Sequence, residues 1–457
     1  MKKENKSVKA YKGFNKYMQC TPNGEIFQYE IGKEYKEDEA NLCHCGFHAC
    51  ENPLDVLSYY NNIDDKFCEV ELDEIDPNRN RDSKICGKKI KIDIEIGFLG
   101  LFKAGIEWIK NKTIFTKEDF KKLPSGDYAQ IGSSSDYAQI GSSSDDAKIS
   151  SSGDDAQISS SGDGAKISSS GNYAQIGSSG DYVQIGSFGH NAKIGSFGHN
   201  AKIGSSGDDA KIGSSGNGAK ISSSGNYAQI SSSGNYAQIS SSGDDAKIGS
   251  SSDNAKIGSS GHNAKIGSSG DDAQISSSGY NVQIGSSGDD AKIGSSSDDA
   301  KIGSSGYNAK IGSSSDGAKI GSSGDYVQIG SSGYNVKIGS SGDDAKISSS
   351  GNYAQISSSG NYAQISSSGH NAQIGSSGDG AKIDSSGDDC VIMCAGINSS
   401  AKAKIGSWIT LAEWKYSEEK QKCIPFSVVT KQVDGIEIKE DVYYTLQDGK
   451  FKESKQQ

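Results

Sequence analysis

A nine-residue phrase, repeated without insertion, constrains this chain more than any other feature. Its regular form is Ala-(Lys/Gln)-Ile-(Gly/Ser)-Ser-Ser-Gly-x-x, and it occupies about residues 125–393. The isoleucine recurs at every ninth position from Ile131 to Ile392, which makes 30 copies. A short period with unchanging apolar positions means that each copy buries its apolar face only by stacking on its neighbours. The repeat therefore predicts a long β-solenoid.

Alternation within the phrase predicts a short strand followed by a turn. Ala and Ile are two residues apart and point to one side of an extended segment, while the intervening Lys or Gln points to the other. The same alternation turns the second residue after each Ile inward, as at Ser133, Ser142 and Ser151. A helix is excluded, because nine residues make two and a half turns and successive isoleucines would fall on opposite faces. A Gly/Ser-rich linker has a similar composition, but it would not keep an isoleucine in phase.

The number of copies per coil stays open at this stage. Two copies per coil would give about 15 coils and three would give about 10, and we prefer two. The coil-to-coil backbone hydrogen bonds leave an edge at each end, so both ends need caps. We therefore expect three parts, which are an α+β domain over 1–120, the solenoid over 125–393 and a β capping region over 394–457.

The net charge of the chain lies in the repeats. They contain 27 Asp and 16 Lys, which accounts for the whole formal charge of −11. An acidic rod disfavours nucleic acid as its direct ligand. The charge is compatible with a basic protein partner, or with solubility alone.

Several negative signals indicate a reduced, cytoplasmic protein. The charged start of the chain leads into no apolar run, so no secretory signal is visible. The most apolar segment, 94–109, contains Glu95, Lys103 and Glu107 and is too short to span a membrane. Nine cysteines form no even framework of spacings.

The first 120 residues have the patterns of an ordinary α+β domain. Asn52 as N-cap and Pro53 in the first turn predict a short helix over 52–60. A second segment with helical spacing, 98–109, is expected to pack on the sheet. Strands are expected over 8–14, 26–32, 67–72 and 89–94.

One dense cluster of possible metal ligands lies in this domain. Cys43, Cys45, His48 and Cys50 lie within eight residues, and four such ligands satisfy a tetrahedral zinc site. The spacing matches no standard zinc module. The alternative is a buried turn and strand, in which Cys50 belongs to the core and His48 is hydrogen-bonded.

The same region resembles ADP-ribosyltransferase-like domains. The resemblance rests on an early Tyr-Lys-Gly strand, a later Gly-Phe-His-Ala-Cys strand and a following helix with paired tyrosines. It implies a nucleotide-dependent transferase in which Lys12 takes the place of the usual Arg. The catalytic acid would then be Glu69 or Glu71, although no paired-glutamate signature is present.

The two residues before each Ala vary most among the repeats, and they are candidates for a binding surface. Calcium-binding nonapeptide rolls have Asp in every ligand position, whereas Asn, His, Tyr or Gly replace it freely here, so we do not expect calcium. The large side chains at these corner positions are Tyr173, His190, His199, Tyr227, Tyr236, His262, Tyr353, Tyr362 and His370.

The nine-residue pattern ends after residues 390–394, where Val391 replaces the usual Lys or Gln in an apolar run. We expect this run to be buried, with Cys390 and Cys394 as core residues. Two strand pairs should follow, with turns at Asp434-Gly435 and Asp448-Gly449.

Three phrases at the two ends of the chain resemble a family of phage and prophage proteins. They are Tyr-Lys-Gly-Phe at 11–14, Gly-Phe-His-Ala-Cys-Glu-Asn-Pro-Leu at 46–54 and Val-Asp-Gly-Ile-Glu-Ile-Lys at 433–439. The resemblance implies a phage-encoded accessory or structural protein and supplies no catalytic residues. Our leading hypothesis is a non-enzymatic scaffold whose acidic rod binds a host or phage protein, in one form as a DNA mimic. The alternative is the transferase, with the rod as a spacer.

Overall fold

The computed structural model describes residues 7–21, 26–42, 44–60, 65–78, 83–97, 100–101, 103–105, 108 and 128–454. The chain consists of two compact units, Met1–Ala255 and Lys256–Gln457. The first contains an N-terminal sheet domain and the earlier coils of a β-solenoid, and the second contains the later coils and a C-terminal strand cap. The solenoid has about 16 turns, so the predicted fold class is confirmed. Within the described residues, no helix has the length and apolar character needed to cross a membrane.

The N-terminal domain is an antiparallel five-stranded sheet of order β4-β7-β5-β1-β6. Because β6 also pairs with β7, four of the strands close on themselves around one core. Ala10 and Phe14 from β1 and Phe47 from β5 lie in that core. The strands are β1 (Val8–Phe14), β4 (Glu34–Lys36), β5 (Phe47–Cys50), β6 (Lys66–Ile75) and β7 (Lys84–Glu95), with a separate pair of β2 (Gln19–Cys20) and β3 (Phe27–Gln28).

A second apolar cluster lies under the predicted short helix. The helix is the 3-10 helix η2 (Pro53–Ser58). Asn52 Oδ1 accepts the N–H of Leu54 at 3.2 Å, as expected of an N-cap. Leu54 packs with Phe67 and with Leu101, and the described residues between 97 and 108 are helical. The strand expected over 26–32 is shorter than predicted, since only the two residues of β3 are extended.

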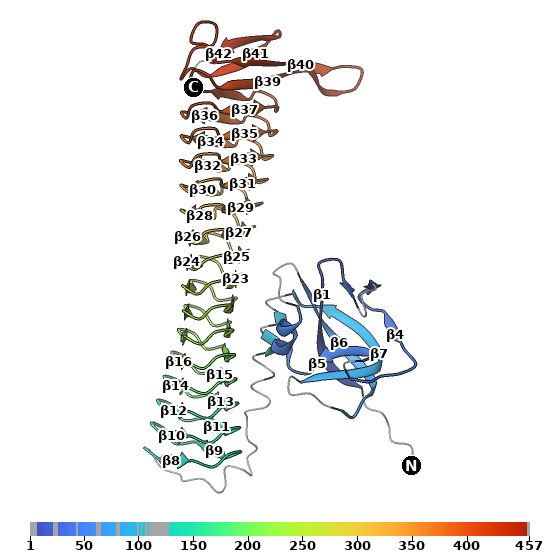
Figure 1. Ribbon diagram of the computed structural model, residues 1–457, viewed down its shortest axis with the longest axis vertical. Coiled ribbons are helices and arrows are strands. Elements are labelled where there is room, and N and C mark those ends of the chain that lie inside the picture. The colour runs from blue at the N-terminus through green and yellow to red at the C-terminus, as the bar shows by residue number, and fades with distance from the viewer. Residues whose placement is uncertain are drawn as a thin grey trace. The chain divides into compact units, whose positions relative to one another are not determined.

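Each repeat contributes one four-residue strand to the solenoid, and two repeats make one coil. The strands follow at nine-residue intervals from β8 (Gln130–Ser133) to β37 (Val391–Cys394). In the second unit β28 (Lys310–Ser313) pairs in parallel with β30 (Gln328–Ser331), so that Ile311 lies against Ile329. Partners are therefore 18 residues apart, and even- and odd-numbered strands form two separate sheets (Figure 1).

The interior of the coils is narrow and is built from small side chains and isoleucine. From Ile140 onward, Ala and Ile of the repeats are almost completely buried, and the inward Ser, such as Ser142 and Ser151, is buried with them. The alternation predicted from the sequence is thus confirmed. Hydrophobic burial by the isoleucine ladder and continuous coil-to-coil hydrogen bonding stabilise the stack.

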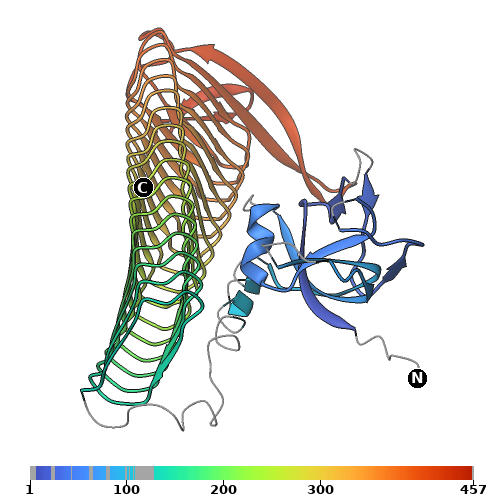
Figure 2. The same ribbon diagram turned by 60° about the horizontal axis from the view of Figure 1, so that its bottom comes forward.

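The C-terminal cap completes both sheets. On one sheet β39 (Trp408–Ser417) lies parallel to β37 and forms a hairpin with β40 (Lys422–Gln432) that projects beyond the coils (Figure 2). On the other, β38 (Ser400–Lys402) pairs with β41 (Tyr444–Gln447), which turns through Asp448-Gly449 into β42 (Lys450–Glu453). These pairings cover the last coil, as expected of a cap.

One predicted turn is wrong. Asp434-Gly435 joins no strand pair, because β40 has already turned back on β39 through residues 418–421. Instead, Asp434 Oδ1 accepts three backbone N–H groups, from Ile436, Glu437 and Ile438, at 2.9–3.0 Å. The Asp therefore organises a loop between β40 and β41.

Candidate binding surfaces

Lys12 lies at the aromatic core of the N-terminal domain. Its Nζ donates to the carbonyl of His48 at 2.8 Å and lies 5.7 Å from the ring centroids of both Phe14 and Tyr29. Ring quadrupoles attract a cation at this distance. The side chain thus has a carbonyl and two aromatic partners within its own domain.

The acids that the transferase resemblance requires lie on the other side of the sheet. Lys12 is opposite Cys68 in the register of β1 and β6, and Glu69 is one residue further along. Successive side chains of a strand point to opposite faces, so Glu69 faces away from Lys12. It forms an ion pair with Lys9 at 2.7 Å instead. The structure does not bring the pair together.

Three of the four proposed zinc ligands, Cys45, His48 and Cys50, lie within the described residues. Cys50 belongs to the cluster with Leu54 and Phe67, and the carbonyl of Cys45 accepts the thiol of Cys86 at 3.0 Å. Cys43 lies outside the described residues. Among those that are described, no three Cys, His, Asp or Glu side chains gather in a way that would hold a metal.

His48 is held neutral by its surroundings. Burial, helped by the positive charges of Lys84 and Lys12, lowers the pKa of His48 to about 4. Its imidazole therefore carries no charge at pH 7.

The first corner residue of each repeat has a structural role that the sequence did not reveal. An oxygen of Asp or Asn at this position accepts the backbone N–H of the residue 18 positions later, as Asn352 does from His370 at 2.9 Å. Histidine can do the same through Nδ1. The histidines predicted as binding residues, His190, His199, His262 and His370, accept in this way at 3.0–3.2 Å.

The second corner residue adopts a left-handed backbone conformation. Asp, Asn and Gly tolerate positive φ, and they occupy this position in most repeats. The predicted tyrosines Tyr173, Tyr227, Tyr236, Tyr353 and Tyr362 adopt it as well, with φ of 57–61° and side chains that are 42–62 % exposed. For a bulky residue this conformation costs about 1 kcal/mol or more. The turn itself therefore does not explain these tyrosines, although the neighbouring rings of Tyr334 and Tyr353 do pair at 5.2 Å.

The outer faces of the two sheets carry uniform ladders of Lys and Gln. In the odd-numbered sheet, Lys301, Lys319 and Lys337 lie directly opposite one another on three consecutive strands. The same face ends at β37 with Val391 and Met393, which are 45 % and 54 % exposed. The expectation that this apolar run is buried is thus wrong for its two outward residues, whereas Cys390 and Cys394 are buried as predicted.

The fold defines a β-solenoid repeat protein with an N-terminal sheet domain and a C-terminal strand cap. Residues 8–104 match the model of a family described as a domain of unknown function, DUF7666, so the N-terminal sheet domain is a DUF7666 domain. Comparison with curated proteins and with solved structures gave no match.

Proposed function

We propose that this protein is a non-enzymatic, phage-encoded scaffold that binds a basic protein partner through the acidic corners of its solenoid. The observation that carries the proposal is the separation of charge on the coils. Lys is confined to the outer faces of the strands, whereas Asp, apart from Asp384, lies at the corners. A stack of coils repeats this separation at about 4.8 Å per coil.

Three aspartates on one corner of the second unit illustrate the available charge. Asp289, Asp325 and Asp343 are exposed, and Oδ1 of each accepts a backbone N–H of the next coil at 2.7–2.8 Å. None of the three forms an ion pair within the described part of the chain. The backbone bond fixes the direction of each carboxylate and leaves its second oxygen for a partner. A carboxylate oxygen presented in this way favours cationic side chains.

The corner tyrosines support the same surface. Exposed Tyr is a frequent contact residue in protein interfaces, because it offers a large area at a small cost in conformational entropy. Tyr182 and Tyr326 directly follow Asp181 and Asp325, in a backbone conformation that Asn or Gly would adopt at lower cost. A partner that presents Arg or Lys next to apolar groups suits this combination, and a DNA-binding protein is one such partner.

The repeats themselves supply variants that test the proposal without disturbing the fold. Asn occupies the first corner position in several repeats and accepts the same backbone bond, so D289N, D325N and D343N together remove three charges and keep the turn. The matched control is K292Q, K310Q and K346Q on an outer face, where Gln also occurs naturally.

The measurement is capture from host-cell lysate by the full-length chain, with elution in a salt gradient. We expect the corner variant to release its partner at lower salt than the parent chain and the face variant to elute unchanged. Capture that is insensitive to the corner charges, or that is lost equally in both variants, would overturn the proposal.

A further inference from the structure

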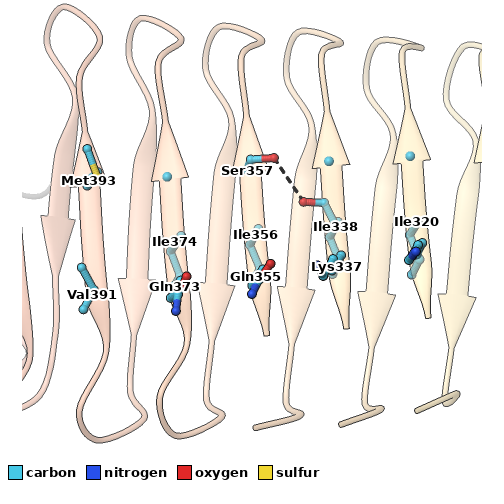
Figure 3. A pocket seen from close by; sticks show the side chains of 14 residues that line it. Ile320, Lys337, Ile338, Gln355, Ile356, Ser357, Gln373, Ile374, Val391 and Met393 are labelled. Atoms are coloured by element: carbon cyan, nitrogen blue, oxygen red, sulfur yellow. Dashed lines mark hydrogen bonds between the residues drawn. The ribbon is translucent and has the colours of Figure 1, made fainter. Parts of the chain in front are cut away.

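A groove runs across five neighbouring strands of the odd-numbered sheet in the second unit. The strands are β29 (Lys319–Ser322), β31 (Lys337–Ser340), β33 (Gln355–Ser358), β35 (Gln373–Ser376) and β37. Its volume is about 880 Å³, which is the size of a ligand-binding cleft. Two parallel rows of residues form it, as Figure 3 shows.

The two rows differ in how far their side chains extend from the sheet. One row consists of the Lys, Gln and Val side chains at the first position of each strand. The other row contains Gly321, Gly339, Ser357 and Gly375, followed by Met393 at the end. A Cβ added at Gly321 or at Gly375 would meet no atom within 4 Å, so the floor is open above these residues. The small residues thus form a trough beside the ridge of longer side chains.

The chemistry of the groove changes from one end to the other. Lys319 and Lys337 lie at one end, Gln355 and Gln373 in the middle, and Val391 and Met393 at the other end. Trp408 lies opposite Val391 on β39 and is 46 % exposed, so the apolar end continues onto the cap. On the outer face of the other sheet, Lys382 is followed by Ser400 on β38 rather than by an apolar residue, and the Lys382 ammonium lies over the ring of Tyr443 at 4.4 Å.

The basic end lacks counter-charges. Lys319 and Lys337 lie directly opposite each other in the register, and like charges in that arrangement repel. Neither lysine forms an ion pair with another described residue. An anionic group placed over the two would offset the repulsion.

We propose that this groove binds an extended peptide segment that has acidic residues at one end and apolar residues at the other. Four strand spacings of about 4.8 Å separate the two ends, which gives about 19 Å, or six extended residues. The amides of Gln355 and Gln373 would bond the peptide backbone between the ends. This site is distinct from the acidic corners of the proposed function, because it recognises the opposite charge on a different surface.

The probe is a fluorescent eight-residue peptide with two glutamates, four serines and two leucines in that order, and its control has the same composition in mixed order. Binding to the full-length chain is measured by fluorescence anisotropy at low and moderate salt. The test variant is K319Q with K337Q, and the matched control is K310Q with K346Q on the opposite sheet. Gln is native at equivalent positions of both ladders, so each variant should fold.

We expect saturable binding of the ordered peptide that weakens about fivefold or more in K319Q/K337Q and remains unchanged in K310Q/K346Q. A second variant, V391S with M393S, should weaken binding by a similar factor, because it removes the apolar end. Absence of saturable binding, equal binding of the mixed-order peptide, or equal losses in the two lysine variants would each overturn the proposal.

Discussion

At the residue scale, the repeat is determined by where a side chain has room. In most repeats a glycine follows two residues after the strand and lies against the backbone of the coil before it, and a Cβ at Gly342 would lie 1.9 Å from the carbonyl oxygen of Gly324. The glycine inside the strand has no such constraint, since a Cβ at Gly321 would meet nothing within 4 Å. The two glycine positions of the repeat are therefore occupied by glycine for different physical reasons.

This difference gives a paired prediction. Gly342→Ala should lower the free energy of unfolding by about 1–3 kcal/mol, because the coil must shift to admit a methyl group. Gly321→Ala should be neutral or slightly stabilising, because the strand conformation is retained and the unfolded chain loses freedom. Urea unfolding of the full-length variants checks both, and equal effects at the two positions would contradict the account of coil contact.

Much of the residue pattern was predictable, and the rest depended on register. Alternation alone placed Ala, Ile and the inward Ser in the interior. It did not reveal that His370 accepts a backbone N–H from the next coil, because its partner Asp388 is 18 residues away. Nor did it show that Lys12 and Glu69 face opposite sides of a sheet, since this requires knowing which strands pair.

At the scale of the element, the cap depends on a loop rather than on the expected hairpin turn. An Asp-Gly dipeptide is a good turn signal, and Asp448-Gly449 does join β41 to β42. Asp434-Gly435 has the same sequence, but its Asp accepts three N–H groups of the loop that follows. These bonds hold the pKa of the Asp434 carboxyl below its usual range.

We predict that Asp434→Ala loosens this loop without unfolding the coils. Loss of the shared acceptor should speed amide hydrogen exchange at Ile436, Glu437 and Ile438 roughly tenfold. Asp434→Asn keeps an acceptor oxygen, so its exchange rate should lie between those of the parent chain and of D434A. Lowering the pH through the depressed pKa should speed exchange in the parent chain as well, relative to the intrinsic rate, because the protonated carboxyl accepts poorly. Unchanged protection in D434A, followed by mass spectrometry, would show that the loop is held by other contacts.

At the scale of the whole molecule, the surface follows from one structural fact, which is that two repeats make a coil. With this periodicity, residues of one type lie above one another every 18 positions, so faces of Lys and Gln alternate with corners of Asp, Asn, His and Tyr. A nine-residue repeat suits either two or three repeats per coil, so the repeat length alone favoured neither. Both proposed binding surfaces depend on that choice.

Disulfide trapping tests most directly whether two repeats make a coil. Lys337 and Gln355 are register partners 18 residues apart, and cysteines on adjacent strands at about 4.8 Å lie within disulfide range. We predict that K337C with Q355C oxidises to an intramolecular disulfide, identified by peptide mapping, whereas K337C with Q364C, 27 residues apart, does not. A disulfide in the second pair but not in the first would indicate three repeats per coil and would contradict the faces and corners described above.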